Sequence, residues 1–438
     1  MKKVLCLGAG LVARPFIQYL SDNGFHVTVA SRTISKAEHL VEGCKNTETI
    51  AFNIVNDDDL LEELTKKADL VCSLLPYTFH VKAAKAAIKH QTHFCTTSYI
   101  SNEMKALEKD AIKAGVILLN ECGVDPGIDH MSAMKIIDEV HSNNGKIMSF
   151  TSFTGGLPAP EANTNPYGYK LSWSPRGVLL AGRNDALFLR DGKEIKIPGP
   201  ELFEHFELME IPGIGTFEGY PNRDSLSYID IYSIQETKTM LRGTLRNIGW
   251  CSTLDKIADL GLLDIQERSL DRMTYAALMR ELISTDSPDI KSAVAKACSI
   301  ETRDPIISRL EWLGLFEDKQ IPPGTSTVLD ALCALFEDKM QYAKGERDML
   351  VMHHEFIVEY PDKKQRITST LIDYGIPNGD SSMSRTVAFP VAIASKMILD
   401  GKITLTGVHR PTVPEIYKPI LKELETLGIK MDEKISNL

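Results

Sequence analysis

A short apolar strand that runs into a glycine-rich turn constrains the fold of this chain more than any other feature. Residues 4–7 are apolar and lead directly into Gly8-Ala9-Gly10-Leu11-Val12-Ala13, a G-x-G-x-x-A pattern. A helical pattern and a second apolar run at residues 25–30 follow, which places the turn in a βαβ unit of about 30 residues. There the first glycine permits a tight turn, the second lets the backbone approach a pyrophosphate, and the alanine lets the helix pack on the sheet. The pattern predicts a dinucleotide-binding domain; small residues kept only for packing are the alternative.

The end of the second strand indicates which dinucleotide is bound. NAD-binding units carry an acidic residue about 20 residues beyond the glycines, where it accepts hydrogen bonds from the ribose 2′-hydroxyl. Here the positions are Ser31-Arg32-Thr33, with Lys36 one turn into the next helix. A guanidinium without a carboxylate favours a 2′-phosphate, so we expect NADP(H). The alternative for Arg32 is a solvated charge at a strand end.

Length and composition bound the class of protein. A chain of 438 residues is too long for one ordinary core, so two or three domains are expected. No apolar run reaches 18 residues and the first residues lead into a required strand, so we expect neither a membrane span nor a cleavable signal. The net charge of −10, without a basic stripe, argues against nucleic acid. A small-molecule substrate is favoured. An anionic substrate would need individual arginines that create a local positive site in this acidic chain.

The cysteines and histidines suggest neither disulfides nor a metal. The 8 cysteines are scattered without a C-x-x-C pair, and several lie in apolar strand patterns, which favours a reducing compartment, here the cytoplasm. His353-His354-Glu355 has no histidine at a useful i+4 position, so we expect no metal site.

Strand and helix patterns alternate as far as about residue 125. Strands are predicted at 48–53, 69–75, 93–97 and 116–120, with helices near 57–66, 78–89 and 102–114. This alternation predicts a doubly wound parallel sheet, whose ligands lie beyond the carboxyl ends of its strands. Three segments there carry polar groups: residues 74–77, residues 96–99 and residues 121–127. Turn and helix-cap roles are the alternative, and Asp125 could cap a helix with Pro126 at its first position.

The pattern changes after a predicted helix at about 126–143. Residues 146–155 alternate as a strand, a Gly/Pro-rich loop follows to residue 166, and further strands are predicted at 185–197, 229–242, 351–360 and 364–374. This predicts a second, mostly antiparallel sheet. Residues 250–345 have amphipathic helical patterns and look inserted, and a last helix at 387–399 precedes a short strand at 403–406.

Several strings together resemble the saccharopine dehydrogenase family, and the NADP-dependent, L-glutamate-forming type, or saccharopine reductase, most of all. They are Gly8-Ala9-Gly10, Leu75-Pro76-Tyr77, residues 97–101, Gly123-Val124-Asp125-Pro126-Gly127-Ile128-Asp129-His130, residues 155–160 and Trp173-Ser174-Pro175-Arg176-Gly177. The resemblance covers essentially the whole chain. It implies interconversion of saccharopine with L-glutamate and 2-aminoadipate 6-semialdehyde through an imine, in the aminoadipate pathway of lysine metabolism. The physiological direction stays open.

The resemblance also implies a domain plan. Residues 1–125 would form a Rossmann-type NADP-binding domain, with residues 385–438 packing back onto it and completing its sheet. Residues 126–250 and 346–384 would form an α+β substrate-binding and dimerisation domain. Residues 251–345 would be a small helical insert, and the enzyme would be a homodimer.

Substrate residues carry over from the family by position. The resemblance places saccharopine against Ser98, Tyr99, Asp125, Arg223, Thr244, Leu245 and Arg246. Saccharopine has three carboxylates, and guanidinium forks suit them in an acidic protein. Asp125 and Tyr99 are the candidates for proton handling. Some relatives carry a thiol where this chain has Thr154.

The same correspondence assigns the cofactor residues. The phosphate turn comprises Gly8, Gly10, Leu11, Val12, Ala13 and Arg14; the 2′-phosphate side comprises Ser31, Arg32 and Thr33; the adenine side comprises Asn53 and Ile54; and the nicotinamide half comprises Leu75, Ser98, Val124, Asp125, Pro126, Ser172 and Trp173. Two other functions stay open. The substrate of a carboxynorspermidine-type dehydrogenase would have one carboxylate fewer, so that enzyme should not need both Arg223 and Arg246. A non-catalytic NADP-binding regulatory module would need neither these arginines nor Asp125.

Overall fold

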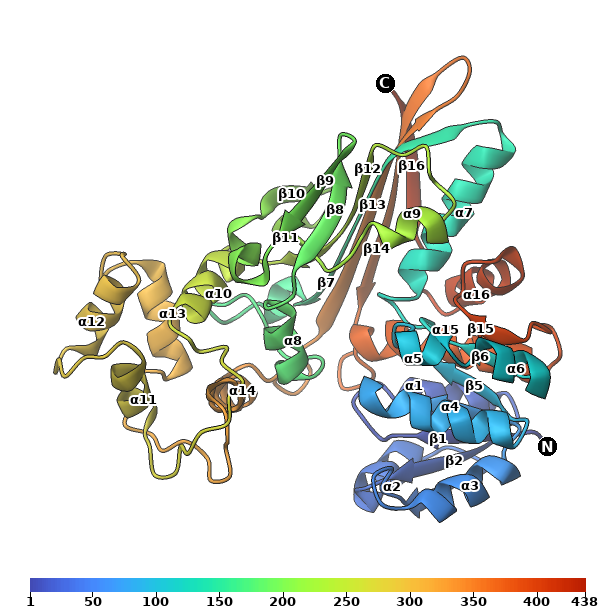
Figure 1. Ribbon diagram of the computed structural model, residues 1–438, viewed down its shortest axis with the longest axis horizontal. Coiled ribbons are helices and arrows are strands. Elements are labelled where there is room, and N and C mark those ends of the chain that lie inside the picture. The colour runs from blue at the N-terminus through green and yellow to red at the C-terminus, as the bar shows by residue number, and fades with distance from the viewer. The chain divides into compact units, whose positions relative to one another are not determined.

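The strand that precedes the glycine turn, β1 (Lys3–Leu7), lies inside a seven-stranded sheet (Figure 1). From edge to edge the strands are β15 (Gly407–His409), β6 (Ile117–Leu119), β5 (His93–Thr96), β4 (Leu70–Ser73), β1, β2 (His26–Ser31) and β3 (Thr47–Ala51). All neighbouring pairs are parallel. This confirms the predicted parallel sheet and its completion by a C-terminal strand.

Helices cover both faces of this sheet, because its strands are apolar on both sides. Leu5 and Leu7 face a core that includes residues of α3, α4 and α6, while Val4 and Cys6, on the opposite side of β1, are also buried. The other face is covered by α1 and α15, which pack together. The helices of this part are α1 (Arg14–Asp22), α2 (Ile34–Val41), α3 (Asp58–Lys67), η1 (Tyr77–Phe79), α4 (His80–Lys89), α5 (Asn102–Lys105), α6 (Glu108–Ala114), α7 (Ile128–Ser142), α15 (Ser382–Leu399) and α16 (Pro414–Thr426).

The computed structural model describes all 438 residues, and they separate into two units. The first unit comprises residues 1–145, 360–362 and 371–434; the second comprises residues 146–359, 363–370 and 435–438. The finer three-part division and its boundaries stay predictions.

A second sheet begins at β7 (Lys146–Pro158). Its other strands are β8 (Ala186–Arg190), β9 (Lys193–Ile197), β10 (Glu207–Ile211), β11 (Gly215–Pro221), β12 (Thr239–Arg246), β13 (Asp348–Glu359), β14 (Lys364–Tyr374) and β16 (Asp432–Asn437). Strand β7 is antiparallel to β13 and parallel to β12, whereas β11 is antiparallel to both β10 and β12. The prediction of a mostly antiparallel sheet is confirmed by these pairs, among which the parallel β7–β12 pair is an exception that residue alternation could not reveal.

The helical character predicted for residues 250–345 is confirmed. Polar N-cap side chains begin four of its helices, since the side-chain oxygens of Thr274, Asp289, Asp304 and Thr327 accept hydrogen bonds from first-turn amides. The helices of the second unit are η2 (Pro160–Ala162), α8 (Pro175–Ala181), η3 (Gly199–Glu204), α9 (Ser227–Ile231), α10 (Trp250–Asp259), α11 (Tyr275–Leu282), α12 (Ile290–Ala297), α13 (Pro305–Leu313) and α14 (Val328–Lys339).

Two predicted strands are wrong or displaced. Residues 403–406 form no strand, because the Ile403 amide bonds back to the Met397 carbonyl at the end of α15, and sheet pairing starts at Gly407. Residues 229–242 form a strand only from Thr239 onward. Asp224 Oδ1 accepts the amides of residues 226 and 227 and starts the short helix α9 there instead.

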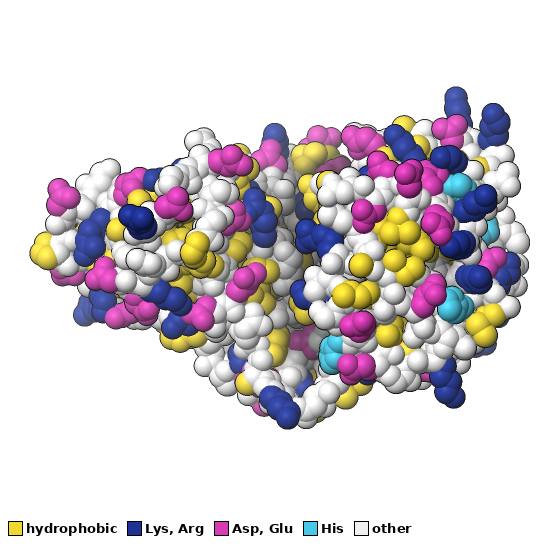
Figure 2. Space-filling model, turned by 90° about the horizontal axis from the view of Figure 1, so that it is seen from below, with side chains coloured by type: hydrophobic (Ala, Val, Ile, Leu, Met, Phe, Trp, Pro, Cys, Tyr) yellow, Lys and Arg dark blue, Asp and Glu magenta, His cyan; other side chains and the backbone are white.

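The surface carries both signs of charge. Figure 2 shows Lys and Arg side chains interspersed with Asp and Glu across the visible face, without a continuous basic stripe. The helices of the fold include none with the length and apolar character needed to cross a bilayer. No three of its His, Cys, Asp and Glu side chains gather as a metal site would require.

Candidate functional site

The glycine turn has the geometry that a phosphate needs. Gly8 has φ +112°, and a Cβ there would lie 2.9 Å from the Leu74 carbonyl oxygen, so a side chain is excluded. A Cβ at Gly10 would meet nothing within 4 Å, and Leu11 beside it is exposed. Ala13 is fully buried, and α1 starts at Arg14 without a side-chain cap. Its first amides therefore remain available to an anion, and the turn fits a pyrophosphate.

The end of β2 leaves a free cation. Arg32 and Thr33 are exposed, the Ser31 hydroxyl accepts from the Thr33 amide at 3.3 Å, and Arg32 forms no ion pair in the chain. Because no carboxylate neutralises Arg32, its guanidinium can pair with a 2′-phosphate. These residues fit NADP(H) better than NAD(H).

Most of the remaining predicted cofactor residues of the first unit could contact a cofactor only through their backbone atoms. Asn53 makes a local turn, in which its Oδ1 accepts the Val55 amide at 3.1 Å, and Ile54 is buried. Leu75 packs against the core below the sheet edge, Val124 is buried, and the Pro126 carbonyl accepts the Gly123 amide at 2.9 Å. Any cofactor contact from Val124 or Pro126 would therefore involve their backbone.

A buried histidine joins the ends of two strands. His80 Nδ1 lies 2.9 Å from Ser73 Oγ at the end of β4, and its Nε2 lies 2.8 Å from Ser98 Oγ, just after β5. Burial lowers the pKa of His80 to about 4, so the ring is neutral at physiological pH. Sequence reasoning missed His80, although it lies three residues after the end of the Leu75-Pro76-Tyr77 string; Ser98, by contrast, was predicted.

The two predicted proton-handling residues touch. The Tyr99 hydroxyl donates to Asp125 Oδ1 at 3.1 Å, although these residues follow different strands, β5 and β6. Asp125 does not cap α7: the helix begins at Ile128, and the carboxylate of Asp129 instead accepts the Gly127 amide at 2.5 Å. The structure therefore brings together a phenol and a carboxylate at the carboxyl edge of the parallel sheet.

A second carboxylate lies beneath this pair. Glu121 is 1% exposed, and its side chain lies 2.9 Å from His130 Nε2 and accepts Arg410 Nε at 2.8 Å and the Ile100 amide at 3.0 Å. Although burial raises the pKa of Glu121, hydrogen bonding and charge from His130 and Arg410 outweigh it and hold the pKa below its usual range. The sequence pointed to Glu121 only as part of a post-strand segment; its signal is a carboxylate that follows directly on a buried strand.

In the second unit, Arg246 at the end of β12 is a buried cation without a carboxylate partner. It is 5% exposed and stacks over the rings of Tyr169 and Trp250, at 5.1 and 5.4 Å from their centroids. Its Nη1 donates to the Leu245 carbonyl at 3.0 Å, whereas its Nε has no partner. Glu218, opposite Arg246 in the β11–β12 ladder, instead accepts the Gly249 and Cys251 amides, both at 2.7 Å.

The other predicted arginine lies at the opposite end of the same ladder. Arg223 follows β11, is exposed and has φ +53°. Pro221 pairs with Gly243, so Arg223 lies beside residue 241, five positions from Arg246. That is roughly 17 Å along the strand. The two guanidinium groups are thus suited to separate carboxylates of a long ligand rather than to one shared carboxylate.

Other predicted residues of the second unit differ in accessibility. Thr244 pairs with Thr154 in the parallel β12–β7 register, and the buried hydroxyls of Thr154 and Ser172 have no partner. Leu245 is fully buried, which leaves only its backbone for a ligand. Trp173 is half-buried against Gly177. The cofactor roles of Ser172 and Trp173 and the substrate roles of Thr244 and Leu245 stay predictions.

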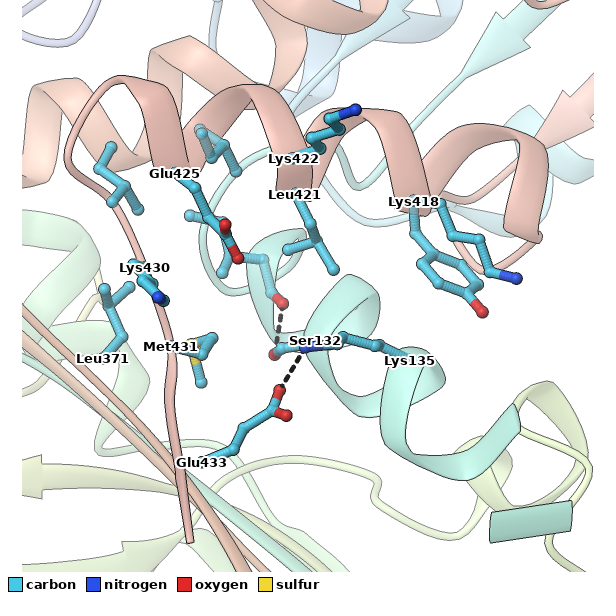
Figure 3. Close-up of a pocket in the computed structure, with 14 residues that line it drawn as sticks. Ser132, Lys135, Leu371, Lys418, Leu421, Lys422, Glu425, Lys430, Met431 and Glu433 are labelled. Atoms are coloured by element: carbon cyan, nitrogen blue, oxygen red, sulfur yellow. Dashed lines mark hydrogen bonds and ion pairs between the residues drawn. The ribbon is translucent and has the colours of Figure 1, made fainter. Parts of the chain in front are cut away.

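A pocket in the first unit involves none of the predicted site residues. It has a volume of about 340 Å³ and lies between α7, α16 and residues 429–433 (Figure 3). Lys135 and Glu433 form an ion pair of 2.8 Å across it. Its apolar wall comprises Ile128, Leu371, Leu421, Leu424, Ile429 and Met431. The chemistry predicted at the sheet edge is therefore not housed in this pocket.

Comparisons with known proteins match this chain over almost its whole length. A family model described as the saccharopine dehydrogenase NADP binding domain matches residues 4–119, and one described as the saccharopine dehydrogenase C-terminal domain matches residues 123–429. The saccharopine dehydrogenase [NADP(+), L-glutamate-forming] of Schizosaccharomyces pombe is 44% identical over 99% of both chains, and that of Saccharomyces cerevisiae is 43% identical over 99% of both. The solved apo structure of the L-Glu-forming enzyme from Saccharomyces cerevisiae superposes with a TM-score of 0.90 at 42% identity and covers 100% of both chains.

Proposed function

Because the chain belongs to the saccharopine dehydrogenase family, we propose that it interconverts saccharopine with L-glutamate and 2-aminoadipate 6-semialdehyde, with NADP(H), in lysine metabolism. In the oxidative direction, the bond between the secondary amine and the terminal side-chain carbon of the lysine moiety becomes an imine. Water then hydrolyses the imine to the aldehyde and glutamate. A bound NADP⁺ would supply the hydride acceptor for that carbon.

The observation that carries the substrate assignment is the state of Arg246. A buried guanidinium without a carboxylate is costly, unless a ligand supplies the missing partner. Saccharopine offers three carboxylates. We assign one of them to Arg246 and another to Arg223, since the two residues are roughly 17 Å apart along the β11–β12 ladder.

The cofactor would be held by the first unit. The amides at the start of α1 and the open space beside Gly10 suit the pyrophosphate, and Arg32 suits the 2′-phosphate. Ser98 would lie near the nicotinamide half, where the neutral His80 ring fixes the orientation of its hydroxyl.

Proton handling is assigned to the Tyr99–Asp125 pair. Its 3.1 Å hydrogen bond lets a proton pass between the phenol and the carboxylate. In the oxidative direction the pair would receive the amine proton and help water add to the imine. Thr154, at the position where some relatives carry a thiol, cannot serve as a thiol acid or base.

Assembly and location remain proposals as well. A homodimer is expected from the family resemblance, and the absence of any disulfide among the eight cysteines is compatible with a reducing, cytoplasmic compartment. Light scattering of the purified protein tests the dimer, and cell fractionation tests the compartment.

One assay tests the function. The purified enzyme is incubated at high pH with saccharopine and either NADP⁺ or NAD⁺, and the products are identified. We expect NADP⁺ reduction with release of glutamate and the semialdehyde. Release of lysine instead of glutamate would overturn the assignment. Loss of saccharopine affinity in Arg223→Ala, with NADP⁺ binding intact, tests the second carboxylate site.

A further inference from the structure

Glu121 brackets the predicted proton-handling tyrosine in the chain. Its own amide donates to the Ser98 carbonyl at 3.0 Å, and its Oε1 accepts the Ile100 amide at 3.0 Å. Tyr99 lies between these two anchored residues. One residue therefore fixes the backbone on both sides of Tyr99.

The same side chain also anchors the segment that carries Asp125. Glu121 Oε2 lies 2.9 Å from Nε2 of His130, a fully buried residue of α7, and this helix starts three residues after Asp125. Oε1 additionally accepts Arg410 Nε at 2.8 Å, from the segment after β15. Four chain segments thus meet at one carboxylate: those after β5, β6 and β15, and the first turn of α7.

The backbone of Glu121 indicates that this arrangement is imposed. Glu121 has φ +56°, a left-handed conformation that is uncommon for a residue with a side chain, and it is 1% exposed. Such a conformation persists where the surrounding contacts determine it, and it is frequent at functional sites.

We infer that Glu121 is a positioning residue for the reaction: through the reach of its side chain, it holds the Tyr99 hydroxyl and the Asp125 carboxylate at hydrogen-bond distance. This inference rests on the proposed function of the Tyr99–Asp125 pair. It assigns the role to the length of the side chain, because the contacts with Ile100, His130 and Arg410 need carboxylate oxygens at that distance from the backbone.

Three substitutions separate reach from charge. Glu121→Gln keeps the length and an acceptor oxygen, Glu121→Asp keeps the charge and shortens the side chain, and Glu121→Ala loses both. We expect Glu121→Gln to stay within about 3-fold of the wild-type kcat, and the Asp and Ala variants to lose about 30-fold or more, since small misplacements of reacting groups cost up to about 100-fold. KM for saccharopine and NADP⁺ should change by less than about 3-fold in all three.

Glu62 provides the matched control. It also contacts a histidine and a cation, His90 at 2.5 Å and Lys89 at 2.8 Å, but it lies on α3 and takes no part in the sheet edge. The Asp and Ala variants of Glu62 should keep the wild-type kcat. Circular dichroism and NADP⁺ titration check that each variant is folded.

Two results would overturn the inference. Equal kcat in the three folded variants would show that Glu121 has only a structural role, and a Gln variant as slow as the Ala variant would show that charge acts instead of reach. If the wild-type protein does not oxidise saccharopine, the proposed function fails, and a crystal structure of Glu121→Ala still decides this inference. We expect the 3.1 Å Tyr99–Asp125 bond to be broken in that variant, and an intact bond would refute the role.

Discussion

The buried polar groups at the predicted site are satisfied differently in the two units. In the first unit, His80 is bonded at both ring nitrogens, and Glu121 is bonded through both oxygens. In the second unit, Arg246 Nε, Trp250 Nε1, Thr154 Oγ1 and Ser172 Oγ are buried without partners. A buried polar group without a partner costs about 1–3 kcal/mol, so the fold tolerates such groups chiefly where a ligand completes them. Groups whose hydrogen bonds are made within the protein therefore form closed networks that fix the geometry of the site, whereas buried groups without a protein partner are open to a substrate.

Arg246→Ala should give the largest effect, because Arg246 differs most clearly from the fully bonded polar groups of the first unit. If the buried guanidinium meets a substrate carboxylate, saccharopine affinity should fall by about 3 kcal/mol, which is roughly 100-fold. NADP⁺ affinity should not change, and the melting temperature of the ligand-free protein should change little, since Arg246 has no carboxylate partner to lose. Calorimetric titration with saccharopine and with NADP⁺ measures both affinities.

Arg309 is the control for this prediction, because its guanidinium is satisfied by the protein. It donates to the Pro166 carbonyl at 2.9 Å and to Thr253 Oγ1 at 3.2 Å. Arg309→Ala should lower the melting temperature and leave saccharopine affinity unchanged. If both arginine variants lose stability and affinity together, the distinction between open and closed groups is wrong.

His80 tests the closed network of the first unit through pH. Its pKa is about 4 in the folded protein against 6.5 for an ordinary histidine, so below pH 6.5 the unfolded state takes up a proton that the folded state does not. The His80 contribution to stability is therefore fully present above pH 6.5, and about 2 kcal/mol of it should be lost by pH 5. Urea unfolding of the wild type and of His80→Asn at pH 7.5 and pH 5 isolates this slope, because every other titrating group is common to both proteins. Parallel pH dependence in the two proteins would show that His80 is not held neutral.

Gly8 and Gly10 of the phosphate turn differ in the space around them, so alanine substitutions should affect stability differently. Gly8→Ala should cost about 1–2 kcal/mol of stability, because Gly8 has φ +112° and a Cβ would lie 2.9 Å from the Leu74 carbonyl oxygen. Gly10→Ala meets nothing within 4 Å and should leave stability unchanged. Both variants should bind NADP⁺ more weakly, the second because its methyl group occupies the space of the pyrophosphate. Unchanged NADP⁺ affinity in Gly10→Ala would place the phosphates elsewhere.

Some features of the fold and of the site could be predicted from the sequence, and others could not. The parallel sheet was predictable because most of its strands are short apolar runs, such as residues 4–7, and the order of such runs implies the topology. The meeting of Tyr99 and Asp125 followed from the rule that strand ends share one edge. Neither rule identifies His80 or Glu121, whose partners lie up to 289 positions away in sequence. The hairpin of β10 and β11 was missed for a different reason, since its edge strand is mostly exposed and gains its place from pairing.

Arg32 should give the smallest effect, because it is exposed and its charge is screened by solvent. Arg32→Asp should lower NADP⁺ affinity by about 10-fold and raise relative affinity for NAD⁺, since a carboxylate repels a 2′-phosphate and accepts from a ribose hydroxyl. Added salt should weaken wild-type NADP⁺ binding more than that of Arg32→Ala, because screening acts on a solvent-exposed pair. The buried Arg246 should show the opposite, with saccharopine binding that depends little on salt. An unchanged ratio of the NADP⁺ and NAD⁺ affinities in Arg32→Asp would show that Arg32 does not contact the phosphate. The residue that selects NADP⁺ over NAD⁺ would then be unidentified.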